Sequence, residues 1–186
     1  MTDSVFDAAG FLTFDLAAGE LRSRENERLV VIPAETLDAL PVGQALEQTW
    51  RRWGRLHGAS LAAHLRKVGG RPGIEVLADH LGGSLAALGL GKISVEIRGD
   101  ALVFRLTENK SGRASPASRD LLSCFLGGYL EAIGPDRFEV LPLDEQGRGA
   151  LFFAGCTEAV GKVRGWVEQG AGALEAVERL SKGQAI

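Results

Sequence analysis

The decapeptide CFLGGYLEAI, residues 124–133, decides how this chain folds, because it combines large apolar side chains with two adjacent glycines and one cysteine. Gly134-Pro135 follows at once and ends any helix there. A phosphate-binding loop would place its glycines between a strand and the N-terminus of a helix, not inside an apolar run of helical spacing. The decapeptide therefore predicts a closely packed helix, in which Gly127 and Gly128 let the backbone approach the strands of a sheet.

A β-hairpin is predicted on each side of this helix. The first runs from Ile93 to Leu106, with apolar residues at alternate positions and a turn at Gly99-Asp100. The second runs from Phe138 to Phe153 around the turn-rich stretch 144–149. Because the helix lies between the two hairpins in sequence, we expect it to lie across their sheet, and the side chains expected beneath it are Phe125, Leu126, Tyr129, Leu130 and Ile133.

Two helices are predicted before the first hairpin. Apolar residues recur at spacings of three to five from Leu46 to Leu65, in a pattern interrupted or tightened near Gly54 and Gly58, which indicate close helix contacts. Helical spacing resumes over residues 74–88 and ends at Gly89, a suitable C-cap.

Near the N-terminus, two runs of strand-forming residues, 11–16 and 28–32, flank a charged, turn-rich stretch, and Pro33 ends the second run. The order of all these elements predicts an α+β fold. We expect an antiparallel sheet of about four strands, made of two hairpins and packed against helices.

The segment after Cys156 has helical spacing as far as Lys182, although each of its four glycines lowers helix propensity by roughly 1 kcal/mol relative to alanine. Its wide apolar stripe needs a cover, either the sheet of the same chain or a second subunit. We expect a domain over residues 1–156 and an amphipathic helix over 157–186 that serves an interface, with the interface residues Val160, Val163, Trp166, Val167, Leu174 and Val177.

The composition and net charge of the chain indicate which classes of partner to expect. The chain of 186 residues is 45% hydrophobic and 24% charged, as is usual for one soluble globular domain, and its net charge of −3 gives no reason to expect nucleic acid. No stretch approaches the roughly 20 apolar residues that span a bilayer, and the first residues lack the pattern of a signal peptide. We therefore expect a cytoplasmic protein without a membrane span.

No complete catalytic constellation is present. His57 and His64 are seven residues apart on one helix, or about 10 Å, which is too far for a shared metal ion. Ser123 lies in an apolar helix without the strained turn of a nucleophile elbow. Cys124 and Cys156 are expected to stay thiols in a reducing compartment. We expect no catalytic residue, no metal and no cofactor.

Trp50 and Trp53 share a predicted helix with Arg51 and Arg52. Tryptophan brings a large contact area and one polar group, so this pair can line an apolar cleft or anchor a partner. Packing in the core is the simpler alternative, and the residues alone leave both open.

Two segments, RLVVIP at 28–33 and CFLGGYL at 124–130, resemble motifs of the 4-vinyl reductase domain family, which is related in fold to the small subunits of the TRAPP vesicle-tethering complex. The resemblance spans residues 10–156. A third family motif, whose cysteines and glutamate help to bind zinc in some members, keeps only its glycine here, since its positions fall on Pro142, Glu145, Gly149 and Phe153.

The resemblance implies binding of a small hydrophobic molecule, such as a tetrapyrrole precursor or an aromatic hydrocarbon, or a role as a dimeric scaffold. The first hypothesis is a non-catalytic module with an apolar pocket. Alternatives are a homodimeric TRAPP-like scaffold or adaptor for a protein partner, and an accessory factor of tetrapyrrole reduction. A stand-alone reductase is least favoured, because no cofactor site is visible. The expected ligand-binding residues are Trp50, Trp53, Phe125 and Tyr129.

Overall fold

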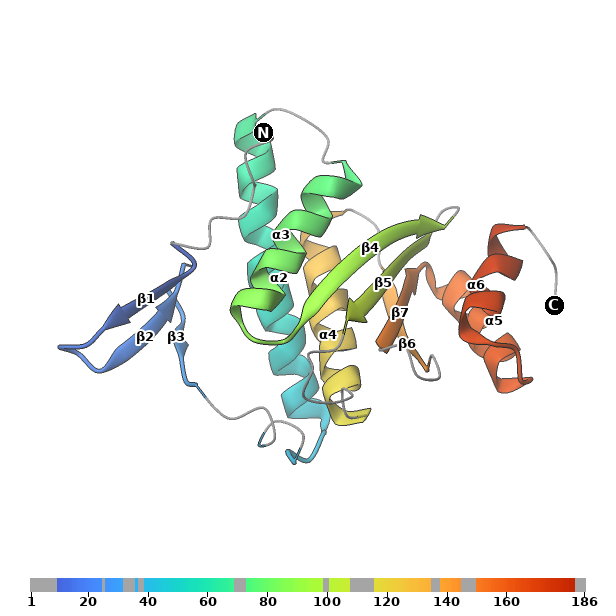
Figure 1. Ribbon diagram of the computed structural model, residues 1–186, viewed down its shortest axis with the longest axis horizontal. Coiled ribbons are helices and arrows are strands. Elements are labelled where there is room, and N and C mark those ends of the chain that lie inside the picture. Colours follow the sequence, from blue (N-terminus) through green and yellow to red (C-terminus); the bar gives the residue numbers. More distant parts are fainter. Residues whose placement is uncertain are drawn as a thin grey trace.

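A four-stranded antiparallel sheet with helices on both faces forms the centre of the protein, and a smaller three-stranded sheet lies beyond the helices that cover one of these faces (Figure 1). The computed structural model describes residues 10–24, 26–31, 36, 39–68, 73–98, 101–107, 116–134, 138–144 and 150–182. Its elements are β1 (Leu12–Asp15), β2 (Glu20–Ser23), β3 (Arg28–Leu29), α2 (Gln44–Val68), α3 (Ile74–Ala87), β4 (Lys92–Arg98), β5 (Ala101–Thr107), α4 (Pro116–Ile133), β6 (Glu139–Asp144), β7 (Ala150–Gly155), α5 (Thr157–Glu168) and α6 (Ala173–Ser181).

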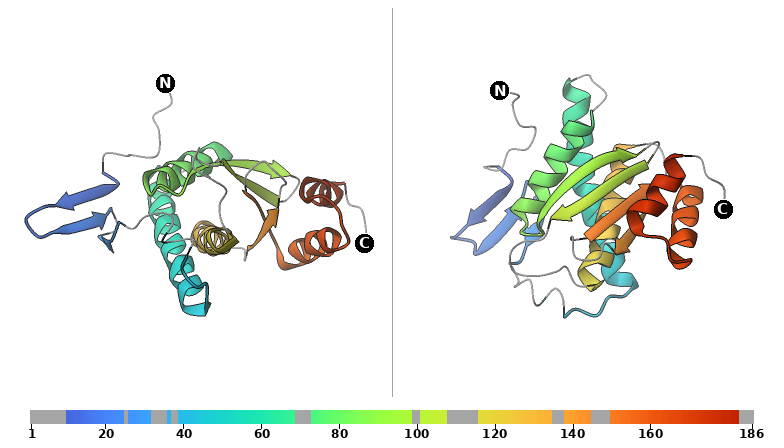
Figure 2. Two further views of the ribbon diagram at one scale, coloured as in Figure 1. Left: turned by 60° about the horizontal axis from the view of Figure 1, so that its bottom comes forward. Right: turned by 45° about the vertical axis from the view of Figure 1, so that its right-hand side comes forward.

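The main sheet has the strand order β4-β5-β7-β6, and both expected hairpins are present. Strand β7 is buried on both faces, because successive side chains point to opposite sides of a strand. Phe152 packs in a core with α2, α3 and α4, while Phe153 packs in a second core with α5 and α6. Figure 2 shows these two helical layers on either side of the sheet. The predicted α+β fold is confirmed.

Helices α2 and α4 pack so closely that their backbones touch. A Cβ atom on Gly54 would overlap the carbonyl oxygen of Phe125, and one on Gly128 would overlap the carbonyl oxygen of Arg51. Gly58 meets the carbonyl oxygen of Tyr129 in the same way. Glycine permits this approach because it has no side chain, and α2 runs through its two glycines without interruption.

The prediction that Gly127 and Gly128 face the strands is wrong. Gly128 faces the backbone of α2, and a Cβ on Gly127 would lie 3.8 Å from the guanidinium carbon of Arg51. The large side chains of α4 are buried in the core that it shares with α2, α3 and one face of the sheet. The rings of Phe125 and Tyr129, also expected beneath α4 toward the sheet, contact α2 and α3.

The C-terminal segment forms two helices, not the single expected helix. Gly170 takes a positive φ of 94° after α5 and reverses the chain, so that α6 runs back beside α5. Val160, Val163, Trp166 and Val177 are buried against the sheet of the same chain. Only Val167 and Leu174 of the expected interface residues stay partly exposed. An interface here and a domain division at residue 156 stay predictions.

The charged stretch near the N-terminus contains β2, so that three strands form there instead of two. Phe11, which precedes β1, is buried, and the centroid of its ring lies 5.5 Å from that of His57. This contact attaches the small sheet to α2. Ile32, Pro33 and the turns at 99–100 and 145–149 lie outside the described residues. In the part of the chain described, no helix has the length and apolarity to cross a membrane.

Gly128→Ala is expected to destabilise the protein by about 1–3 kcal/mol or more, because the new methyl group overlaps the backbone of α2. Gly161→Ala is the matched control, since a Cβ there meets no atom within 4 Å. It should stabilise the protein by about 0.5–1 kcal/mol through helix propensity. Urea unfolding monitored by circular dichroism measures both, and equal effects would contradict the backbone contact.

Trp166→Ala is expected to cost about 3–5 kcal/mol of folding stability, since the tryptophan is buried against the sheet. Urea unfolding at two protein concentrations checks this. If Trp166 is a core residue, the loss of folding stability should be the same at both protein concentrations. A variant that keeps its stability but changes its oligomeric state would instead establish α5 as an interface helix.

Candidate functional site

An aromatic cluster lies between α2 and α4, under the smaller sheet. Trp53 of α2 is central to it, with its ring centroid 5.3 Å from that of Trp50 and 5.4 Å from that of Phe125. Phe125 in turn stacks at 6.4 Å on Tyr129, one helical turn further along α4. The structure therefore brings together the four residues expected to bind a ligand.

The spacing of residues along both helices produces this cluster. Trp50, Trp53 and His57 are three and four residues apart on α2 and therefore share one face. Phe125 and Tyr129 are four apart on α4. The backbone contacts at the glycines of both helices hold these two faces at ring-contact distance. His64, the other histidine considered as a metal ligand, is exposed, whereas His57 is buried.

A buried hydrogen bond extends the cluster to α3. The hydroxyl of Tyr129 and Nδ1 of His80 are 2.9 Å apart. Burial raises the pKa of Tyr129 well above its ordinary value, so the phenol stays protonated, and the tautomer of the imidazole decides whether its hydroxyl donates to Nδ1 or accepts from Nδ1–H. Sequence reasoning missed His80 as a site residue. Its available signal was its place on the apolar face of α3, three residues after Leu77.

Two buried polar atoms of this region have no hydrogen-bond partner among the described residues. They are Nε1 of Trp53 and Oγ of Ser84, which lies one helical turn after His80. A buried donor without an acceptor costs about 1–3 kcal/mol, so such atoms in a folded protein call for an explanation. One explanation is a ligand atom that completes the hydrogen bond when the site is filled.

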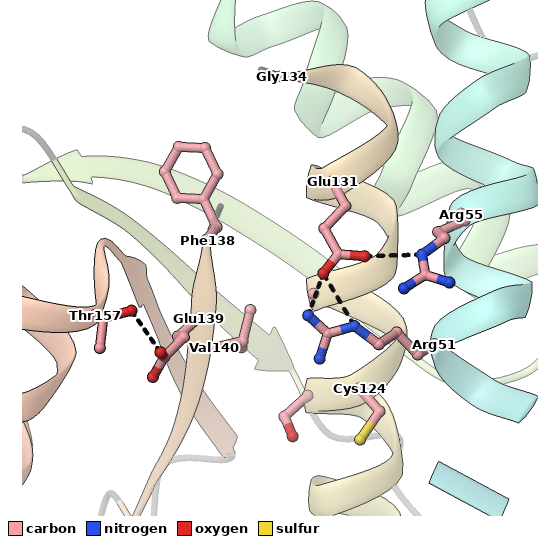
Figure 3. Close-up of a pocket in the computed structure, with 11 residues that line it drawn as sticks. Arg51, Arg55, Cys124, Glu131, Gly134, Phe138, Glu139, Val140 and Thr157 are labelled. Carbon is pink, nitrogen blue, oxygen red and sulfur yellow. Dashed lines mark hydrogen bonds and ion pairs between the residues drawn. The ribbon is translucent and has the colours of Figure 1, made fainter. Parts of the chain in front are cut away.

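A second site, a groove of about 880 Å³, opens beside α4 (Figure 3), and none of the four residues of the aromatic cluster lines it. It lies between α4 and β6, which is one of the two edge strands of the main sheet. The lining residues come from four elements. Helix α2 contributes Arg51 and Arg55, α4 contributes Ser123, Cys124, Gly127, Glu131 and, after its end, Gly134, β6 with the residue before it contributes Phe138, Glu139 and Val140, and α5 contributes Thr157.

Ion pairs close one end of this groove. Arg51 donates from Nε and Nη2 to Oε1 of Glu131, and Arg55 donates from Nε to the other carboxylate oxygen at 2.8 Å. The hydrogen bond from Arg51 lowers the pKa of Glu131, and the same bond raises the pKa of Arg51. Glu131 is thus ionised at neutral pH and ties α4 to α2.

The cysteines are both free thiols, Cys124 half-buried in the groove and Cys156 exposed before α5. Burial raises the pKa of Cys124, so this thiol stays neutral at physiological pH. In the described residues, no group of three or more His, Cys, Asp and Glu side chains is placed to hold a metal ion.

Comparison with known proteins gives a structural match without a sequence match. No family model matches the chain, and no curated protein matches its sequence. Among solved structures, the fold is similar to the crystal structure of the phenol-responsive sensory domain of the transcription activator PoxR with phenol. The TM-score is 0.57 at 14% identity, and the match covers 81% of this chain and 87% of that one. This likeness establishes the fold.

Proposed function

We propose that this chain is a binding module for a small aromatic molecule of the phenol class, held in the aromatic cluster between α2, α3 and α4. The observation that carries the proposal is the buried Nε1 of Trp53, which lies among aromatic rings without a described hydrogen-bond partner. The fold likeness to a phenol-responsive domain supports it, as does the resemblance of residues 124–130 to the 4-vinyl reductase family.

The cluster provides both kinds of contact that a phenol needs. Its rings meet mostly edge to face, the arrangement that aromatic pairs prefer, and a ligand ring can join them in the same way. The ligand hydroxyl accepts from Nε1 of Trp53, and the bond between Tyr129 and His80 is a further polar contact of the cluster.

Access to the cluster requires a side chain to move. Phe125 and Tyr129 are fully buried, whereas Trp53 is only partly buried and therefore has the least packing to lose. In this mechanism Trp53 swings aside, admits the ligand and closes over it, with its N–H donating to the ligand oxygen. Neither a redox group nor a catalytic residue is needed, so the module binds without turnover. An accessory role in tetrapyrrole reduction stays a prediction.

Trp53→Phe is expected to weaken phenol binding about tenfold, because the ring is kept and only the N–H donor is lost. Isothermal titration calorimetry with phenol measures the change. Trp166→Phe is the matched control, since that buried tryptophan belongs to the core on the other face of the sheet. Toluene, which lacks the hydroxyl, should bind the unmodified protein and the Trp53→Phe variant with similar affinity. Absence of phenol binding to the unmodified protein, or equal effects of the two substitutions, would contradict the proposal.

A homodimeric scaffold is the second candidate, and the exposed apolar side chains of the N-terminal sheet favour it. Phe14, Leu16, Val30 and Val31 are large hydrophobic residues in or next to β1 and β3, and Leu16 is 90% exposed. Both β1 and β3 are edge strands of their sheet. Open edges beside apolar side chains are a common basis for pairing between chains.

The double substitution Leu16→Ser and Val31→Ser should convert such a dimer to a monomer, because it removes apolar area from the contact. Light scattering after size-exclusion chromatography measures the mass. Ile97→Ser is the control, since Ile97 is 57% exposed but lies on the main sheet. If the wild-type protein is monomeric throughout the accessible concentration range, the hypothesis of a homodimeric scaffold is contradicted.

A further inference from the structure

The groove between α4 and β6 has surplus positive charge on the α2 side. Two guanidinium groups, those of Arg51 and Arg55, share the single carboxylate of Glu131. Arg55 uses only its Nε in that contact, so its two terminal amino groups have no acceptor among the described residues. Figure 3 shows these amino groups on the α2 side of Glu131. One positive charge and several N–H donors are therefore available to a ligand.

The negative charge on the opposite wall is directed elsewhere. Glu139 accepts a hydrogen bond of 2.6 Å from Oγ1 of Thr157. Its carboxylate points toward α5, away from the two arginines (Figure 3). Its charge still contributes to the raised pKa of Arg51, so an anion bound there meets some repulsion from Glu139.

The remaining walls suit an uncharged hydrocarbon body. Phe138 and Val140 are partly buried and face the groove from the edge strand. Cys124 lines the opposite side with a thiol that burial keeps neutral. Gly127 adds a wall without a side chain next to the guanidinium of Arg51. The groove thus combines a cationic end with an uncharged floor.

We propose that this groove is a second binding site, separate from the aromatic cluster, for a small organic monocarboxylate whose carboxylate lies on Arg55 and Arg51 and whose apolar body lies on Phe138 and Val140. A carboxylate suits the arginines because its two oxygens match the parallel N–H donors of a guanidinium group. Its single charge also equals the one guanidinium charge that Glu131 leaves unbalanced on the α2 side, whereas a doubly charged phosphate would exceed it and would be repelled more strongly by Glu139 of the opposite wall.

Arg55→Gln tests the charged contact. Hexanoate, which has an apolar body but no ring, is titrated into ¹⁵N-labelled protein, and the arginine Nε–Hε signals report binding. Loss of Arg55 should weaken hexanoate binding about tenfold, as expected for a charge-assisted hydrogen bond. Arg52→Gln is the matched control, because Arg52 is an exposed arginine of the same helix outside the groove, and its effect should stay below about twofold.

Glu131→Gln separates binding from a structural role. This substitution removes the carboxylate that competes for both arginines, so it should strengthen hexanoate binding even if it lowers the melting temperature. A residue with only a structural role would weaken binding when replaced. If Arg55→Gln fails to fold, the Glu131→Gln variant still tests the proposal, because stronger hexanoate binding supports the proposal and weaker binding contradicts it.

Three results would overturn the proposal: no hexanoate binding to the unmodified protein, equal losses in Arg55→Gln and Arg52→Gln, or binding of neutral hexanamide as tight as that of hexanoate. Phenol affinity should be unchanged in Arg55→Gln, because the aromatic cluster lies on the other side of α4. The proposals for the two sites can therefore be contradicted independently. Hexanoate binding tests the groove, and phenol binding tests the aromatic cluster.

Discussion

The backbone contact between α2 and α4 is the constraint on which the rest of the structure depends. Gly54 and Gly58 from one helix and Gly128 from the other remove the side chains that would otherwise keep the helices apart. The usual interaxial distance of 8–10 Å depends on the side chains at the contact, and glycine brings it to the low end. The ring contacts and ion pairs between the two helices follow from that approach.

Both candidate sites use this helix pair, on opposite sides. The rings of Trp53 and Phe125 meet within the core, because α2 and α4 present their aromatic faces to each other there. On the outer side, Arg51 reaches past Gly127 to Glu131, a path that a larger side chain at position 127 would narrow. A change in the helix contact would therefore affect an internal apolar site and an external charged groove together.

The main sheet supports the pair because it is covered on both faces. Side chains of β7 alternate between two cores, one under α4 and one under α5 and α6. The alternation leaves β7 without a solvent-facing side, which fixes its register, since a shift by one residue would exchange the two cores. The C-terminal helices thus help to hold the strands against which α4 packs, and α5 also contributes Thr157 to the wall of the groove.

The sequence by itself determined the main secondary-structure elements, because period-two and helical spacing are local properties. It predicted both hairpins, α3 and α4, and it singled out Trp50, Trp53, Phe125 and Tyr129, whose rings the structure brings together. It did not predict that Gly128 would face a helix, that Gly170 would divide the C-terminal helix, or that His80 would join Tyr129. Those features depend on which surfaces meet across long sequence separations. Only the tertiary structure decides that, since a glycine or a histidine is compatible with several neighbours until packing selects one.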